Sequence, residues 1–336
     1  MSGFLSHVYG QKKLKRELKR LLDASRIPHT MIFYGEEGLG KTTAALDLAA
    51  LLTGSSDTFW EEVSAWKEYS DKVPVLTAAR DSVWYIHPLG MELKIEQFRI
   101  FTEAMSVFDG KPKVCIIDEA QTMMPVIANS LLKTLEEPIE NVYFILITHD
   151  IHALLPTIRS RSESFPFFPL SREEYHDLMR SDPQKYKFTD TLTEENVYQL
   201  SEGNPGITLD ICGETENVQP ERAMIFWETL TWAKAPFSVL SEWEMKDRKD
   251  FLRLLRWIIL VGRDLLVIST MPELSMERCI QVSVRERKVA PYWSNGRAEK
   301  ALTILETAET GCRRYISIKN IWDMILIELQ HIQRGK

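Results

Sequence analysis

Residues 31–43 read MIFYGEEGLGKTT, and the fold is built around this stretch. The apolar run 31–34 predicts a buried strand, and the run TAALDLAALL that follows the glycines predicts a helix. Between them, GEEGLGKT (35–42) fits the phosphate-loop pattern G-x-x-x-x-G-K-[ST] in the strand–loop–helix context that the pattern requires. The alternative is a glycine-rich turn without a ligand. The order of the three segments favours a nucleoside triphosphate site.

The chemistry of such a loop assigns a task to each of its residues. Its glycines permit backbone torsions and a close approach that side chains would forbid. Backbone N–H groups and the positive end of the following helix would face an anionic phosphate. Lys41 would reach the β- and γ-phosphates, and the hydroxyl of Thr42 would bind Mg²⁺. The candidate nucleotide-binding residues of the loop are therefore Gly35, Gly38, Gly40, Lys41, Thr42 and Thr43.

Length and composition limit the number of domains and the classes of protein to be considered. The 336 residues are enough for two or three domains, and 44% hydrophobic with 26% charged residues is ordinary for a globular protein. The net charge of −7 gives no general attraction to nucleic acid, so any DNA contact would need a local basic face. No apolar run of about 18 residues predicts a membrane span, and the N-terminus lacks the apolar core of a signal peptide. We therefore expect a cytoplasmic protein without a membrane partner.

The cysteines give no sign of a metal site. Cys115, Cys212, Cys279 and Cys312 lie far apart and form no C-x-x-C pair. They predict neither a zinc site nor a disulfide framework, and buried thiols in a reducing compartment are the expected interpretation.

A second apolar run ends in two carboxylates. Residues 114–117 predict a buried strand, which Asp118 and Glu119 follow directly. Open α/β sheets place ligand chemistry at the carboxyl ends of their parallel strands. Asp118 is therefore a candidate Mg²⁺ ligand, directly or through water, and Glu119 is a candidate for orienting or polarising the attacking water. An acidic pair after a strand is common by chance, but the upstream phosphate loop favours a functional pair.

Alternation of strands and helices predicts the fold class. The long apolar strands end in polar residues, and helical patterns separate them, which is typical of an α/β fold with a parallel doubly wound sheet. Five parallel strands are expected, at 31–34, 83–88, 114–117 and 142–148 and shortly after Arg161.

From Ser171 onward the pattern changes to helices. Ser171 is a good N-cap, and Glu174 three residues later completes a capping box. A polar loop at 213–221 marks a further boundary, and the remainder is helical without a catalytic pattern. We therefore expect a nucleotide-binding core at 1–170, a small helical lid at 171–215 and an all-α C-terminal domain at 216–336.

The densest positive charge lies on a predicted helix at 11–22. Its leucines recur at i, i+4, i+7 and i+8, which gives one apolar stripe. Six lysines and arginines occupy the other faces. They form either a solvated helix face or a surface that follows phosphates, and the sequence leaves both interpretations open.

Five short motifs carry a resemblance to a known family. They are VYGQ (8–11), GEEGLGKT (35–42), IIDEAQ (116–121), ANSLLKTLEEP (128–138) and LLPTIRSRS (154–162). Together they resemble the bacterial clamp-loader AAA+ ATPases of DNA polymerase III, with the closest likeness to the delta-prime subunit. The resemblance is dense over roughly residues 1–210 and weaker beyond, where that family has a collar domain for oligomerisation.

The resemblance implies a role for each residue that matches a motif. Lys41 and Thr42 would bind the phosphates and Mg²⁺, and Asp118 and Glu119 would be the Walker B pair. Arg161 would be an arginine finger that reaches the nucleotide of the neighbouring subunit. Thr148, or alternatively His149, would sense the γ-phosphate. The segment beside the adenine would be Val8, Tyr9, Gly10 and Gln11.

Two departures from the family pattern, and two acidic residues in the phosphate loop, alter what we expect of the site. Gly206 stands where the family has its second sensor arginine, so coupling of ATP to motion and hydrolysis should be weak. The zinc module of related subunits would fall in residues 55–82, which contain no cysteine and no clear strand. We predict no zinc there, with Trp60 and Trp66 as an apolar replacement. The loop residues Glu36 and Glu37 must point away from a bound phosphate or weaken its binding.

The resemblance implies a clamp-loader subunit that binds ATP and Mg²⁺, has weak or no ATPase activity of its own and supplies Arg161 to a motor subunit. Its partners would be tau/gamma-like and delta-like subunits and, through the complex, the sliding clamp and primed DNA. One alternative is that the chain is itself the ATP-hydrolysing motor subunit. Another is a non-hydrolysing scaffold of the same complex. A different AAA+ machine, such as a helicase loader or a junction motor, is a more distant possibility.

Overall fold

The structure, a computed structural model, has two compact units. It describes residues 4–55, 58–66, 73, 75–88, 92–105, 110–137, 139–183, 185–186, 194–212, 218–243, 245, 248–274, 279, 284–294, 296–313 and 317–334. Unit 1 comprises residues 1–183 and 201–208, and unit 2 comprises residues 184–200 and 209–336. The division into three domains stays a prediction, and residues 213–217 of the expected boundary loop lie outside the described residues.

Unit 1 is built on a six-stranded sheet in the order β2-β3-β4-β5-β1-β6. Five of the strands are mutually parallel, as the apolar runs predict. The sixth is an edge strand, β2, which pairs antiparallel with β3. The strands are β1 (Thr30–Tyr34), β2 (Val75–Ala78), β3 (Val83–Ile86), β4 (Lys113–Ile117), β5 (Val142–Thr148) and β6 (Glu163–Pro166).

The edge strand corrects the prediction that residues 55–82 hold no clear strand. The turn from β2 to β3 places Ala79, Arg80 and Asp81 at positive φ (55°, 53° and 62°) without a glycine. Tertiary bonds support that turn: Ala79 N donates to the Glu62 carboxylate at 2.8 Å, and Trp84 Nε1 donates to the Asp81 carbonyl at 2.7 Å. Because a short hairpin is recognised from sequence by its turn glycines, this one gave no signal.

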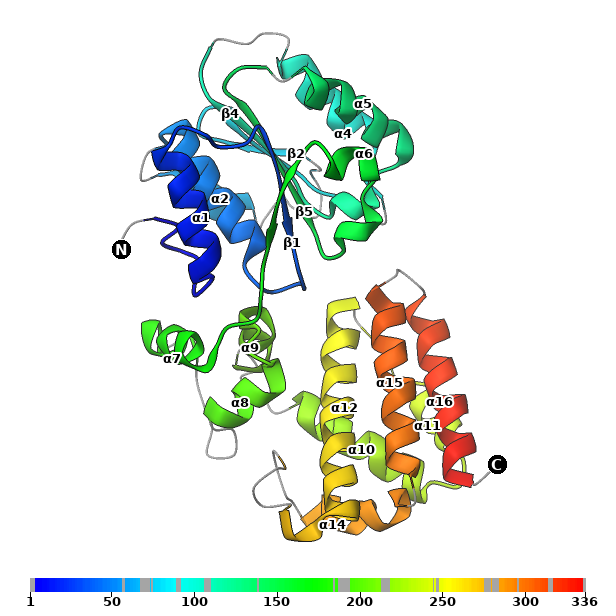
Figure 1. Cartoon of the computed structure of the whole chain (residues 1–336). Coiled ribbons are helices and arrows are strands. Elements are labelled where there is room, and N and C mark those ends of the chain that lie inside the picture. The colour runs from blue at the N-terminus through cyan, green and yellow to red at the C-terminus, as the bar shows by residue number, and fades with distance from the viewer. Residues whose placement is uncertain are drawn as a thin grey trace. The chain divides into compact units, whose positions relative to one another are not determined.

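Helices cover both faces of the sheet, which makes three layers (Figure 1). Alternate strand residues point to opposite sides: Phe33 and Ile116 join the cluster under α1 and α2, whereas Ile32 and Ile117 join the cluster under α4 and α5. The basic stretch forms α1 as predicted, with Leu14, Leu18 and Leu21 buried. The helices of this unit are α1 (Lys12–Asp23), α2 (Lys41–Thr53), α3 (Phe59–Ala65), α4 (Ile95–Met105), α5 (Pro125–Glu136), α6 (Pro156–Arg159) and α7 (Arg172–Ser181).

The start of α7 confirms the predicted capping box. The Ser171 hydroxyl accepts from Glu174 N at 3.4 Å, and the Glu174 carboxylate accepts from Ser171 N at 3.1 Å. Two further helices, α8 (Glu194–Ser201) and α9 (Pro205–Cys212), each contribute residues to both units.

Unit 2 is helical, as the sequence predicts. Buried tryptophans pack in its core, and two of them donate their indole N–H to backbone carbonyls. Trp227 donates to the Ile258 carbonyl at 2.9 Å, and Trp322 donates to the Leu240 carbonyl at 2.8 Å. Its remaining helices are α10 (Val218–Trp232), α11 (Pro236–Leu240), α12 (Arg248–Thr270), α14 (Val284–Val289), α15 (Arg297–Arg313) and α16 (Ile318–Arg334). Among the helices that the structure describes, none combines the length and apolar character needed to cross a bilayer.

Candidate nucleotide site

The phosphate loop lies between β1 and α2, as its sequence predicts. Gly35 N donates to the Thr148 carbonyl at 3.3 Å, which fixes the start of the loop against the end of β5. Gly35 has φ +142°, and a Cβ there would lie 2.6 Å from the Phe167 carbonyl oxygen, so only glycine fits. Glu36 and Glu37 are exposed. The loop therefore presents its backbone and the N-terminus of α2 where the motif predicts them.

Lys41, the first residue of α2, is buried under this loop. Its Nζ donates to the carbonyls of Gly35 at 2.7 Å and Glu36 at 2.6 Å. Burial lowers the pKa of Lys41 to about 8, and the nearby carboxylates of Asp118, Glu37 and Glu36 oppose only part of that shift. The ammonium group thus lies inside the loop, at the place where it can meet a phosphate.

The Asp118 carboxylate, at the end of β4, accepts three hydrogen bonds from three elements. Its Oδ2 accepts from the Thr42 hydroxyl at 3.1 Å and from the Tyr85 hydroxyl at 2.5 Å. Its Oδ1 accepts from Glu119 N at 2.8 Å. Burial raises the pKa of Tyr85, and the negative charge of Asp118 raises it further, so the phenol is a donor here. The structure thus brings the predicted pair Thr42 and Asp118 into direct contact.

The contact between Thr42 and Asp118 fits a magnesium ion. Mg²⁺ takes oxygen ligands and is commonly bound by one or two protein oxygens plus phosphates. The Thr42 hydroxyl uses its only proton on Asp118, which leaves its oxygen lone pairs for a cation. A hydroxyl and a carboxylate in contact, beside a buried lysine, are the donor set that a magnesium–nucleotide would need.

Glu119 begins the segment after β4 in a left-handed conformation, with φ +48°. Such a torsion costs a non-glycine residue about 1–2 kcal/mol. The bond from Glu119 N to Asp118 offsets part of that cost. Backbone strain of this kind is characteristic of functional sites, and here it sets the direction in which the chain leaves the sheet after the carboxylate.

Thr148 lies at the end of β5, paired with Tyr34 of β1 in the sheet register. It is buried, and its hydroxyl both donates to the Asp150 carbonyl at 2.9 Å and accepts from Asp150 N at 3.1 Å. His149, the alternative sensor, is exposed. The backbone of Thr148 touches the phosphate loop through its bond with Gly35 N.

The predicted adenine-side segment, residues 8–11, is fixed at several points. His7, just before it, binds Asp47 of α2 through its backbone N–H at 3.0 Å and through Nδ1 at 2.7 Å. Val8 is buried, and its carbonyl accepts from Lys15 Nζ at 2.5 Å. Tyr9 is exposed. The segment is thereby tied to the helix that starts at the phosphate loop.

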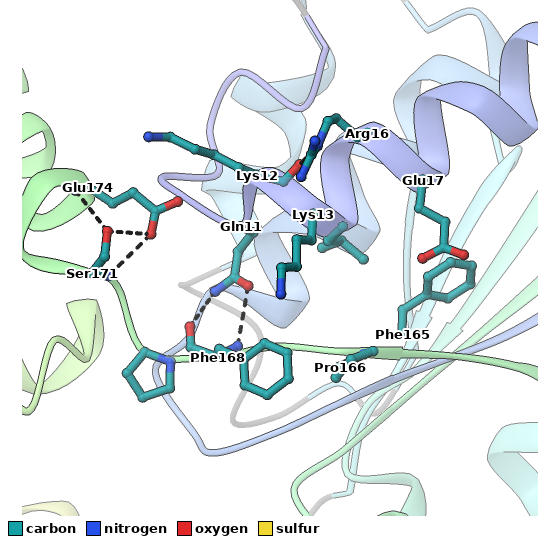
Figure 2. A pocket seen from close by; sticks show the side chains of 12 residues that line it. Gln11, Lys12, Lys13, Arg16, Glu17, Phe165, Pro166, Phe168, Ser171 and Glu174 are labelled. Carbon is teal, nitrogen blue, oxygen red and sulfur yellow. Dashed lines mark hydrogen bonds between the residues drawn. The ribbon is translucent and has the colours of Figure 1, made fainter.

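Gln11 completes that segment and borders a pocket of about 570 Å³ between α1 and residues 165–174 (Figure 2). Its side chain donates to the Phe168 carbonyl at 2.6 Å and accepts from Phe168 N at 3.2 Å. A Cβ at Gly10 would lie 2.4 Å from Leu170, so Gly10 also packs closely on this stretch. The predicted adenine-side residues are therefore held against the segment that follows β6.

The basic side chains of α1 are partly used inside unit 1. Lys15 binds the Val8 carbonyl, Lys12 lies 3.7 Å from Glu173, and Lys19 lies 3.2 Å from Asp23. For these three of the six basic side chains, the contacts favour the interpretation of α1 as a solvated helix face. A contact with DNA phosphates stays a prediction.

Arg161 follows α6 and is partly exposed, with 39% of its side chain accessible. Its guanidinium lies 2.9 Å from the Glu136 carboxylate of α5 and donates to the Thr157 carbonyl at 3.2 Å. The predicted finger is thus held by α5 and α6, at the surface of unit 1.

The turn at residues 203–206 lies directly on the phosphate loop, a contact that the sequence did not predict. Gly206 N donates to the Gly38 carbonyl at 3.0 Å, and Asn204 Nδ2 donates to the Glu37 carbonyl at 2.8 Å. A Cβ at Gly206 would lie 2.5 Å from the Cα of Gly38. The second sensor position is therefore in contact with the loop through backbone atoms.

Trp60 and Trp66, the tryptophans of the cysteine-free stretch, are partly buried against the same apolar cluster as α1 and α2. Trp60 packs against His7 with the rings tilted and their centroids 4.2 Å apart, and Trp66 stacks on Tyr85 with centroids 5.5 Å apart. These contacts agree with an apolar role for the two residues. The absence of zinc stays a prediction.

Comparison with known proteins identifies relatives of the N-terminal half. The family model described as "DNA polymerase III, delta subunit" matches residues 10–171. Over 169 residues the chain is 30% identical to replication factor C subunit 3 of Saccharomyces cerevisiae, covering 50% of this chain and 44% of that protein. Over 174 residues it is 31% identical to DNA polymerase III subunit delta' of Bacillus subtilis, covering 50% of this chain and 51% of that protein.

A third relative is a subunit of another type. DNA polymerase III subunit gamma/tau of Mycobacterium tuberculosis is 29% identical over 213 residues, which cover 62% of this chain and 36% of that protein. The chain thus spans about half or less of the length of these curated relatives.

Proposed function

We propose that the chain is a delta-prime-like clamp-loader subunit, because residues 10–171 match the family model described as "DNA polymerase III, delta subunit" and half of the chain is similar to subunit delta' of Bacillus subtilis. It would act in the cytoplasm, in a hetero-oligomer with tau/gamma-like and delta-like subunits. The complex would place a ring-shaped sliding clamp on primed DNA.

We propose that the subunit binds ATP with Mg²⁺ and hydrolyses it poorly. Lys41 would meet the phosphates, while Thr42 and Asp118 would hold the metal, which would neutralise phosphate charge. The expectation of poor hydrolysis rests on Gly206. At the second sensor position it offers no cation, and its N–H is bonded to the Gly38 carbonyl at 3.0 Å.

Arg161 would stabilise the transition-state charge at the ATP of the neighbouring motor subunit. Its partial exposure and its attachment to Glu136 and Thr157 support this proposal, because a group that acts on another subunit must lie at the surface in a fixed direction.

The finger role can be tested by replacing Arg161 with alanine in the complex reconstituted with its motor and delta-like partners. We expect the DNA-dependent ATPase of the neighbouring site to fall by at least about ten-fold, since arginine fingers contribute about 10³–10⁵-fold in related phosphoryl transfers. Arg161→Lys should recover little, because lysine lacks the planar fork of the guanidinium. Arg99→Ala on α4 is the matched control, because Arg99 is also exposed and paired with a glutamate, Glu103. Unchanged ATPase in the Arg161→Ala complex would refute the finger role.

A scaffold that uses no nucleotide is the second candidate, and one observation favours it: Lys41 is already satisfied by the carbonyls of Gly35 and Glu36. Nucleotide titration of the purified chain separates the candidates. Saturable binding with slow turnover supports our proposal, and no binding supports the scaffold. Rapid turnover that Lys41→Ala abolishes would instead identify the chain as a motor subunit.

A further inference from the structure

Tyr85 contacts the magnesium side of the nucleotide site, although no motif includes it. It lies on β3, next to β4 in the parallel register Tyr85↔Ile116. Its hydroxyl donates to Asp118 Oδ2 at 2.5 Å, the shortest of the three bonds that this carboxylate accepts. β3 also accepts from the backbone of the same aspartate, because Asp118 N donates to the Ile86 carbonyl at 2.8 Å. The strand thus holds both the main chain and the side chain of Asp118.

The three bonds determine how the Asp118 carboxylate is turned. A carboxylate has about four acceptor directions, and Glu119 N, the Thr42 hydroxyl and the Tyr85 hydroxyl occupy three of them. Without Tyr85, Oδ2 would keep only the 3.1 Å bond from Thr42, whose own orientation depends on what its oxygen binds. Tyr85 is therefore the donor that fixes Oδ2 independently of the phosphate loop.

The Tyr85 ring is itself held in place. It stacks on Trp66 with centroids 5.5 Å apart at 21° and on His87 with centroids 5.4 Å apart at 29°. Trp66 in turn donates its indole N–H to the Thr77 carbonyl of β2 at 3.2 Å. The hairpin β2–β3 and the end of α3 thereby set the direction of the phenol.

We propose that Tyr85 is a positioning residue that orients the Asp118 carboxylate for the magnesium ion of a bound nucleotide. This inference rests on the proposed nucleotide site. A carboxylate oriented before the metal arrives loses less conformational freedom on binding it. Partners that orient metal ligands typically contribute about 10–100-fold to metal affinity. Two other donors remain on Asp118 when Tyr85 is removed, so the lower end of that range applies.

The test is the Mg²⁺ dependence of nucleotide binding by the purified full-length chain, followed with a fluorescent ATP analogue. In EDTA, Tyr85→Phe should bind the analogue as the unsubstituted protein does, because the phosphate loop is intact. With Mg²⁺ added, the concentration that gives the half-maximal metal effect should rise about ten-fold. A purely structural defect would weaken binding in both conditions.

Tyr143→Phe is the matched control, because Tyr143 lies on β5 of the same sheet and is likewise partly buried. Its Mg²⁺ midpoint should stay unchanged. If the midpoint of Tyr85→Phe also stays within two-fold, or if Tyr143→Phe shifts equally, the positioning role of Tyr85 is overturned while the nucleotide site stands. If the unsubstituted protein binds no analogue with or without Mg²⁺, both the nucleotide site and the role of Tyr85 are refuted.

Discussion

Replacing Asn204 with alanine should loosen the turn that lies on the phosphate loop. Asn204 is 2% exposed and makes three side-chain hydrogen bonds. Its Nδ2 donates to the Glu37 carbonyl at 2.8 Å, and its Oδ1 accepts from Gly206 N at 3.0 Å and from Ile207 N at 3.3 Å. The first bond bridges the turn to the loop, and the other two cap the N-terminus of α9.

The expected loss of stability on replacing Asn204 has two parts, one from the N-cap of α9 and one from the bridge to Glu37. Loss of an N-cap side chain costs about 1 kcal/mol. The bridge to Glu37 adds about 1 kcal/mol, at the modest end for a buried group because Glu37 is exposed and water can replace part of the bond. The sum of about 2 kcal/mol corresponds to a fall in melting temperature of about 4–8 °C for a unit of about 150–250 residues.

The assay is thermal unfolding combined with hydrogen exchange of the Gly206 amide, which reports on the turn and on its bond to the Gly38 carbonyl of the loop. Asn204→Ser is the matched variant, since serine caps about as well as asparagine but is too short to bridge to Glu37. We expect about half of the alanine effect for serine, with faster exchange at Gly206 in both proteins. Equal effects of the two variants, or a fall of under about 2 °C for alanine, would refute the assignment of these bonds.

Two further predictions concern the loop itself. Because burial lowers the pKa of Lys41 from 10.5 to about 8, the unfolded chain binds more protons than the folded one between these values. Stability should therefore rise through this pH window by about 3 kcal/mol relative to Lys41→Met, measured by urea unfolding, and parallel pH curves would contradict this. Gly206→Arg should lower the melting temperature without raising nucleotide affinity, because any Cβ at 206 would lie 2.5 Å from Gly38. Tighter nucleotide binding at an unchanged melting temperature would count against that contact.

Most of the fold could be predicted because the relevant signals are local. Four of the five parallel strands are apolar runs bounded by polar residues, α1 shows its leucine stripe, and α7 shows its capping box. The edge strand β2 was not predicted, because its hairpin turn uses three non-glycine residues at positive φ. Contacts with Glu62 and Trp84 hold that turn. A turn that distant side chains stabilise has no local sequence pattern from which it could be predicted.

The same distinction applies to the candidate site. Gly35, Lys41 and Thr42 could be predicted because the phosphate-loop motif encodes a local backbone geometry. Tyr85 and Asn204 could not. The contact of Tyr85 with Asp118 spans 33 residues, and the contact of Asn204 with Glu37 spans 167. Both depend on how separate elements pack, which no motif describes.

What the phosphate loop can do depends on competing contacts. A phosphate would exchange the bonds from Lys41 to the Gly35 and Glu36 carbonyls for charge-assisted bonds, which are roughly twice as strong. Against this gain, the carboxylates of Glu36 and Glu37 repel an anion, and the turn bonded to Gly38 offers no cation from position 206. The stronger bonds from Lys41 would stabilise any bound phosphate. A cation at position 206 would matter most in the transition state of phosphoryl transfer, when negative charge develops. Such a site should therefore favour holding a nucleotide over turning it over.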